Sequence, residues 1–337
     1  MSKSNRLLEF DVLRGIAALL VVMYHYTTHY DEIYRHSQEV LVYFPFGHYG
    51  VELFFMISGF VIFMTLERSK RSLDFVVGRF ARLYPAYWTA VIVTFTITTI
   101  AGLPVYQVGW RDALVNLTML EGFLDVPFVD GAYWTLGREL VFYTIMFVLY
   151  RARLLKHIDT ITIGWLLLIV VSIVLEKQAV LVLDQKIQTL LLLQHACQFI
   201  AGMMFYKIYK EGFSLKRYTI ITACALVYAL DHTLLETSLF ILFILIFDLI
   251  LRGRLAFINC TPLIFMGTIS YSLYLVHQNI GYVIIRTLYK FGINPNTSIF
   301  IALVLSLLLA STITFLIEQP AIGLIKRHYK TRVLRQT

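Results

Sequence analysis

His25 is the residue that most clearly could carry chemistry, eleven positions after Arg14 in the first long apolar segment, residues 10–28. Eleven helical residues make about three turns and about 16 Å of rise, so the two side chains share one helix face. Imidazole exchanges protons near neutral pH, and arginine can hold a phosphate or a carboxylate. Because charges are costly in lipid, this face should line a protein interior or a wet cavity. The alternative is a structural histidine and an arginine that extends to the inner interface.

Two carboxylates lie in other apolar segments. Glu139 falls about 9 Å inside the outer end of residues 133–150, about as deep as His25 in its own segment. A carboxylate at this level could orient the imidazole and stabilise its protonated form, although a local pair with Arg138 is the alternative. Glu52 falls about one turn inside residues 49–67 and is expected on the wall of a polar cavity.

Arg79 and Arg82 are spaced i, i+3 and therefore share a face at the expected inner start of residues 84–101. Two arginines on one face would suit a pyrophosphate or a 3′-phosphate presented from the cytoplasm. The alternative is the ordinary excess of positive charge on the inner side of a membrane protein.

The remaining polar candidates are His277, Tyr274 and Trp134. His277 lies in mid-segment with Tyr274 three residues before it, and this polar stripe requires an interior. Catalytic and structural roles are both open for this histidine. Trp134 is either a cavity residue or part of an interfacial aromatic belt, and Tyr133 is assigned to the belt.

The composition indicates that these residues belong to an all-α, polytopic membrane protein. Of 337 residues, 58% are hydrophobic and 15% charged, and the mean hydropathy is +0.73. We expect a single domain over 1–337, with about ten transmembrane helices around a central polar cavity. The predicted spans are 9–28, 49–67, 84–101, 133–150, 161–176, 189–206, 218–231, 237–251, 264–285 and 298–317.

The distribution of Lys and Arg predicts the orientation. With the N-terminus inside, the inner segments carry 21 of these residues and the outer segments 6, which places both termini in the cytoplasm. The formal net charge of +8 is then a topology signal and an attraction for anionic membrane lipid, so no nucleic-acid partner is expected. No phosphate-binding glycine loop, HExxH or GxSxG sequence is present, so neither ATP-driven chemistry nor a metal is expected.

Several segments resemble the acyltransferase-3 family, whose membrane-bound enzymes O-acylate bacterial surface carbohydrates. Arg14 and His25 match its Arg-x10-His signature. Further matches run in family order from residue 8 to 320. They are LRGIAALLVVMYH, VELFFMISGF, RFARLYP, YWTLGRE, ISYSLYLVH and FLIEQP. Two positions depart from the pattern, since Asn279 stands where the family often has proline and Gln319 where it often has a basic residue.

The resemblance implies an acyl-CoA-dependent O-acetyltransferase of the bacterial inner membrane, with acetyl-CoA as donor and a surface or lipid-linked carbohydrate as acceptor. It implies functional roles for Arg14, His25 and Glu139, and acyl-CoA binding by Arg79 and Arg82. The C-terminal esterase-like domain of some relatives is not expected. A proton-coupled glycan or acyl-compound exporter, with His25 and Glu139 as proton relay, is the competing hypothesis.

Overall fold

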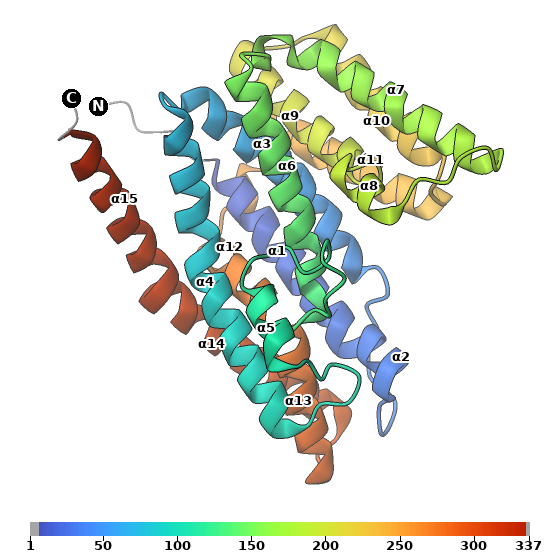
Figure 1. The fold of residues 1–337 in the computed structure, drawn as a ribbon. Helices are drawn as coiled ribbons and strands as arrows, with labels where there is room; N and C mark the ends of the chain where they lie inside the picture. Colours follow the sequence, from blue (N-terminus) through green and yellow to red (C-terminus); the bar gives the residue numbers. More distant parts are fainter. Residues whose placement is uncertain (1–6, 335–337) are drawn as a thin grey trace. The chain divides into compact units, whose positions relative to one another are not determined.

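The computed structural model describes residues 7–334, and every regular element in this range is helical (Figure 1). This confirms the all-α class. Lys3, Arg6 and Arg335, which contribute to the predicted inner charge, lie outside the described residues. Within the described range, five helical stretches are long and apolar enough to cross a membrane, so the predicted number of ten is not confirmed. They are Gly47–Arg68, Ser72–Ala101, Leu155–Lys177, Leu234–Leu251 and Pro295–Arg332.

The chain forms two compact units, and the first comprises residues 1–50, 73–137 and 260–337. At its centre α1 (Leu8–Tyr24) packs along α12 (Thr261–Val276). The two helices meet at glycines: a Cβ on Gly267 would lie 1.9 Å from the Asp11 carbonyl oxygen, and one on Gly15 would lie 2.8 Å from the Gly267 nitrogen. Small residues at such a crossing let two backbones approach closely.

The other elements of the first unit follow in chain order. They are the π-helical turn η1 (His25–His29), α2 (Tyr30–Tyr34), η2 (Gly47–Tyr49), most of α4 (Ser72–Ala101), α5 (Trp110–Asn116), η3 (Gly131–Tyr133), the start of α6 (Trp134–Arg151), α13 (Gln278–Lys290), α14 (Pro295–Ile313), the π-helical turn η6 (Thr314–Glu318) and α15 (Gln319–Leu334).

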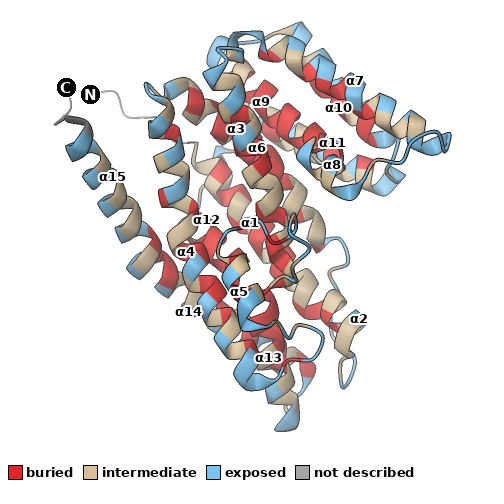
Figure 2. Cartoon of the chain, viewed as in Figure 1, coloured by how far each residue is buried: buried red, intermediate tan, exposed pale blue. Residues whose placement is uncertain are grey.

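The second unit comprises residues 51–72 and 138–259, and α9 (Ala196–Glu211) is its core. Residues 196–206 are all buried, as the red colour of α9 in Figure 2 shows. A Cβ on Gly59 or Gly202 would lie only 2.2 or 2.0 Å from a backbone oxygen, so α3 and α9 touch here. The other elements are α3 (Gly50–Arg68), the rest of α6, η4 (Leu155–His157), α7 (Ile158–Lys177), α8 (Gln185–Leu190), α10 (Leu215–Ala229), α11 (Leu234–Leu251) and η5 (Ala256–Ile258).

Three predicted spans have different boundaries in the structure. The span 84–101 belongs to α4, which already begins at Ser72, because its polar first turns continue the helix beyond the apolar part. The span 264–285 is broken at His277 into α12 and α13. The span 189–206 is interrupted by a turn, since α8 ends at Leu190 and α9 starts at Ala196.

Candidate active site

His25 lies where α1 changes into a π-helical turn. The α-helix is regular from Leu8 to Tyr24, so the three-turn spacing that places Arg14 and His25 on one face is retained. The His25 ring is half-buried, and its Nδ1 lies 2.8 Å from the Val21 carbonyl oxygen. Single π-helical turns inside α-helices occur often at functional sites, because they re-aim side chains that a regular helix would place elsewhere.

The structure brings His277 against His25. The His277 Nε2 atom lies 3.1 Å from His25 Nδ1, and the ring centroids are 4.8 Å apart. His277 is fully buried, and its Nδ1 lies 2.8 Å from the carbonyl oxygen of Tyr274. Both nitrogens of this imidazole are therefore engaged, one by backbone and the other by His25.

Side chains from other elements bond to the backbone around the helix break at His277, whose own carbonyl still accepts from the Gly281 N–H over 2.9 Å. The Tyr26 hydroxyl donates to the His277 carbonyl over 2.7 Å, and the Tyr133 hydroxyl donates to the Leu275 carbonyl over 3.1 Å. The backbone N–H of Asn279 donates to the Asp130 carboxylate over 3.0 Å. Tyr133 is fully buried in this role, so its assignment to an interfacial belt was wrong. These contacts fix the backbone that carries His277.

Arg82 is paired with a buried carboxylate. Its guanidinium forms a salt bridge with Glu318, which is fully buried, and lies 5.6 Å from the centre of the Tyr271 ring. Glu318 also accepts a hydrogen bond of 2.9 Å from the Ser272 hydroxyl, which in turn accepts one from Thr314. The π-helical turn η6 ends at Glu318, so both π-helical turns of the first unit carry ionisable residues into its interior.

The expected position of Arg79 and Arg82 at the inner start of the span 84–101 stays a prediction. Because α4 begins at Ser72, Arg82 lies about 15 Å along the helix. Its partner Glu318 is bonded to Ser272, which precedes His277 by about 7.5 Å along α12. The helix α12 and its C-terminal end therefore carry both Ser272, which is bonded to the partner of Arg82, and His277, which contacts the predicted base His25.

Tyr274 and Trp134 also belong to the first unit. The Tyr274 hydroxyl is buried, lies 3.0 Å from the Ala132 carbonyl oxygen and 2.9 Å from the Thr135 hydroxyl, and so ties α12 to η3 and α6. Trp134 is half-buried at the start of α6. A role in acceptor binding stays a prediction for both.

The predicted carboxylates have partners within the second unit. Glu139 accepts hydrogen bonds from the Ser58 hydroxyl, over 2.7 Å, and from the Tyr143 hydroxyl, over 2.5 Å. Glu52 accepts one of 2.6 Å from Tyr228. The pairing of Glu139 with His25, which belongs to the first unit, stays a prediction. Among residues 7–334, no group of three or more His, Cys, Asp or Glu side chains is arranged to hold a metal ion.

Comparison with known proteins identifies the family. Residues 7–315 match the model of the acyltransferase domain of the acyltransferase-3 type. The chain belongs to the acyltransferase-3 family. Among its relatives is the "Exopolysaccharide production protein ExoZ" of Rhizobium meliloti (strain 1021), 32% identical over 30% of this chain and 34% of ExoZ. "Acyltransferase MdmB" of Streptomyces mycarofaciens is 25% identical over 48% of this chain and 43% of MdmB.

A third relative is "Protein 2 in picA locus" of Rhizobium radiobacter, 32% identical over 42% of this chain and 80% of that protein. The alignments with ExoZ and MdmB thus cover less than half the length of either relative. No solved structure matches the chain.

Sequence reasoning missed several residues that this acyltransferase-3 chain uses around the candidate site. Glu318 lies in the segment FLIEQP, which carried the resemblance without a role for its glutamate. A carboxylate in an apolar segment was the available signal, as it was for Glu139. Asp130 and Tyr26 gave no comparable signal, because their role depends on a helix break that the hydropathy of residues 264–285 does not reveal.

Proposed function

We propose that this chain transfers an acyl group, acetyl in the simplest case, from acyl-CoA to a hydroxyl of a surface or lipid-linked carbohydrate. The family supports acyl transfer in a membrane. The printed name of ExoZ, which refers to exopolysaccharide production, supports a carbohydrate acceptor. The protein would lie in the bacterial inner membrane with both termini in the cytoplasm, as the charge distribution predicts.

The contact between His25 and His277 is the observation that carries this proposal. A carbonyl oxygen only accepts, so the contact with Tyr274 places the proton of His277 on Nδ1. The Nε2 atom of a neutral His277 is then an acceptor, and His25 must donate to it from Nδ1. The Val21 carbonyl also accepts from His25 Nδ1, so this contact likewise requires the proton of His25 to be on Nδ1. His25 is thereby left with its basic lone pair on Nε2.

The reaction follows from this tautomer. The Nε2 atom of His25 takes the proton of the acceptor hydroxyl as that oxygen attacks the thioester carbonyl. The C–S bond then breaks, and the proton passes from His25 to the departing CoA thiolate, which leaves an ester and free CoA. Arg14, on the same helix face, would bind a phosphate or the pantetheine end of the donor.

Arg79 and Arg82 are proposed to bind the donor phosphates. Because Arg82 is already paired with Glu318, it would have to share its guanidinium between the carboxylate and a phosphate. Its five N–H donors permit this. Arg79→Ala with Arg82→Ala should raise the apparent KM for acetyl-CoA, and an unchanged donor dependence would remove both arginines from the donor site.

Glu139 is proposed as a carboxylate required for transfer. Ser58 and Tyr143 both donate to it, which restricts its orientation. A Glu139→Gln protein that keeps the wild-type rate would exclude this role. Trp134 and Tyr274, in the first unit, are proposed to line an acceptor cavity. A role of Glu52 in acceptor binding is proposed separately, and His277 is proposed to act on His25.

The test is release of free thiol from acetyl-CoA by purified protein in nanodiscs, with candidate glycan acceptors. His25→Ala should lower the rate at least about 100-fold, since a positioned general base contributes about 10²- to 10⁴-fold. His157→Ala, an exposed histidine in η4, is the matched control and should retain the rate. Wild-type turnover by His25→Ala would refute the assignment. Flux driven by a proton gradient without CoA would instead support an exporter.

A further inference from the structure

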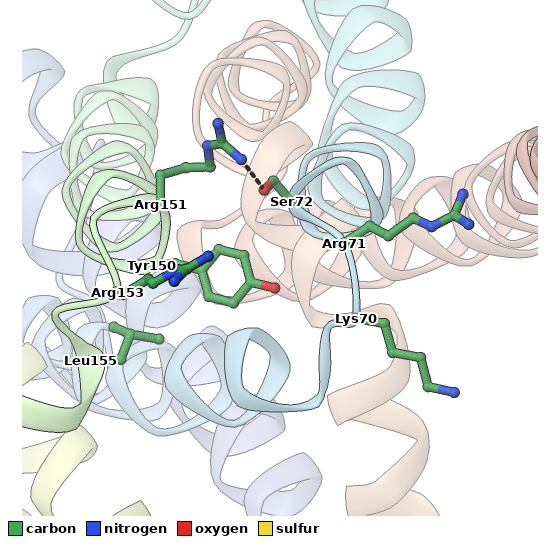
Figure 3. Close-up of a pocket in the computed structure, with 7 residues that line it drawn as sticks. All are labelled: Lys70, Arg71, Ser72, Tyr150, Arg151, Arg153 and Leu155. Atoms are coloured by element: carbon green, nitrogen blue, oxygen red, sulfur yellow. Dashed lines mark hydrogen bonds between the residues drawn. The ribbon is translucent and has the colours of Figure 1, made fainter.

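The second unit contains a cation-lined pocket, and none of its lining residues has been assigned a role above. It has a volume of about 580 Å³ and lies between the turn after α3 and the end of α6 (Figure 3). Four of its lining residues are cations, and none is a carboxylate. The cations are Lys70, Arg71, Arg151 and Arg153.

Two hydrogen bonds hold the walls together. The Tyr150 hydroxyl donates to the Ser69 carbonyl over 2.9 Å, and Arg151 donates to the Ser72 hydroxyl over 3.3 Å. Figure 3 shows Arg151 directed at Ser72 and the Tyr150 ring below them, while Lys70 and Arg71 extend away from the turn. The pocket thus has a tied inner wall and long cationic side chains that can fold over a ligand.

Arg153 lies at the chain reversal that follows α6. Its φ is 58°, in the left-handed region where helix ends usually place glycine. Its N–H donates to the Tyr150 carbonyl over 3.0 Å, and the N–H of Leu154 donates to the Leu149 carbonyl over 2.9 Å. This turn brings the Arg153 side chain to the pocket together with Arg151.

The positive charge of the pocket favours a polyanionic ligand. Positive residues are frequent on the inner side of any membrane protein, but here two separate segments bring four of them around one cavity. Arginine forks bind phosphate oxygens in pairs, and lysine adds a point charge.

We propose that this pocket binds clustered phosphate groups presented from the predicted cytoplasmic side. One source is the nucleotide end of acyl-CoA, whose diphosphate and 3′-phosphate together carry about four negative charges. This source rests on the proposed acyl-CoA donor and is an alternative to phosphate binding by Arg79 and Arg82. The other source is the headgroup of an anionic phospholipid, which the same cations attract at the membrane surface.

The test compares two charge-matched variants in phosphatidylcholine nanodiscs. Lys70→Gln with Arg153→Gln removes two pocket cations. Arg254→Gln with Lys330→Gln removes two exposed cations that do not line the pocket. Equilibrium dialysis with adenosine 3′,5′-bisphosphate should show a Kd raised at least tenfold in the pocket variant and within twofold of wild type in the control. Equal thermal midpoints of the two variants verify that both are folded.

The lipid source is measured in a second arm by native mass spectrometry of phosphatidylglycerol retained by each variant. Loss of retained lipid in the pocket variant alone, with unchanged nucleotide binding, would assign the site to the headgroup. Wild-type behaviour of the pocket variant in both arms would overturn the proposal.

A third arm separates this inference from the transfer reaction. The pocket variant should have lower kcat/KM with acetyl-CoA but wild-type kcat/KM with acetyl-pantetheine, which lacks the nucleotide. If the wild-type protein transfers from neither donor yet binds the bisphosphate through this pocket, the proposed function fails and the phosphate site stands.

Discussion

His277 Nε2 lies 3.1 Å from His25 Nδ1, so a fully buried histidine on α12 touches the predicted base at the end of α1. The contact joins residues 252 positions apart in sequence. In the proposed mechanism, His277 accepts a hydrogen bond from the Nδ1–H of His25, which leaves Nε2 of His25 as the base. His277 would then be a positioning residue that acts through His25.

His277→Ala should lower kcat for acetyl transfer about 10- to 1,000-fold, because His25 loses the partner that fixes its ring and its tautomer. The KM for acetyl-CoA should stay near the wild-type value, because His277 acts on the proton transfer. Steady-state kinetics with acetyl-CoA and a glycan acceptor measure both.

His277→Gln is the matched control, since its amide oxygen can accept from His25 Nδ1 and should restore part of kcat. The pH profile of kcat should move in the alanine variant and less in the glutamine variant. If the two variants lose equal activity together with thermal stability, the role of His277 is structural only.

The Arg82–Glu318 pair should stabilise the first unit. Removing one partner of a buried ion pair costs about 3–5 kcal/mol, because the other charge stays buried without compensation. Arg82→Ala should be more damaging than Glu318→Gln, since it leaves a carboxylate that is fully buried. Thermal midpoints in detergent measure which variant is less stable. The double variant should lose less stability than the two single variants combined.

The same variants separate stability from donor binding. If Arg82 contacts phosphate, Arg82→Lys should raise the KM for acetyl-CoA even where the thermal midpoint recovers, because lysine lacks the fork. Glu318→Gln should leave that KM near the wild-type value. Parallel changes of KM in both variants would indicate that the pair acts only on the fold.

Hydropathy predicted the helical class and most of the helices in this chain, because long apolar segments in lipid have few alternatives to helix. It could not predict the break at His277, since residues 264–285 are apolar on both sides of it. The groups that support this break, Asp130 and Tyr133, come from a distant turn. The start of α4 at Ser72 was missed because charged turns outside the apolar core give no hydropathy signal.

The types of residue in the candidate site could be predicted from the sequence, but their contacts with one another could not. His25 and His277 attracted attention because ionisable groups are rare in apolar segments, and Arg82 because it shares a helix face with Arg79. Their partners depend on helix packing and on two π-helical turns, at residues 25–29 and 314–318, and periodicity at 3.6 residues per turn cannot anticipate either turn. The contact between His25 and His277 was therefore not foreseen.

Asp130 should make the stability of the first unit depend on pH. Burial raises the pKa of its carboxyl from 3.8 to about 7, although hydrogen bonds from the Asn279 and Ala132 N–H groups act in the opposite direction. The folded protein then binds a proton that the unfolded chain releases. Stability is fully present below about pH 4 and is lost as pH rises through 7, at about 1.4 kcal/mol per pH unit.

Asp130→Asn should reduce this slope by the contribution of one proton, as measured by thermal midpoints from pH 4 to pH 8. Glu121 adds a second contribution of the same sign, because burial raises the pKa of its carboxyl to about 7. Asp130→Asn with Glu121→Gln should therefore flatten the profile further. An unchanged slope in the single variant would show that Asp130 is ionised in the folded protein over this range.

Asn279→Pro should destabilise the helix break, even though the resemblance to the family would place proline at this position. The backbone N–H of Asn279 donates to Asp130, and its side chain donates to the Val129 carbonyl over 2.9 Å. Proline removes both donors and also disfavours the helical conformation of Gln278. Leaving buried acceptors unpaired costs about 1–3 kcal/mol each, so the thermal midpoint should fall by several degrees. Asn279→Ala keeps the backbone donor, so its thermal midpoint should fall less. Equal midpoints for the proline and alanine variants would mean that the hydrogen bond to Asp130 does not support the helix break.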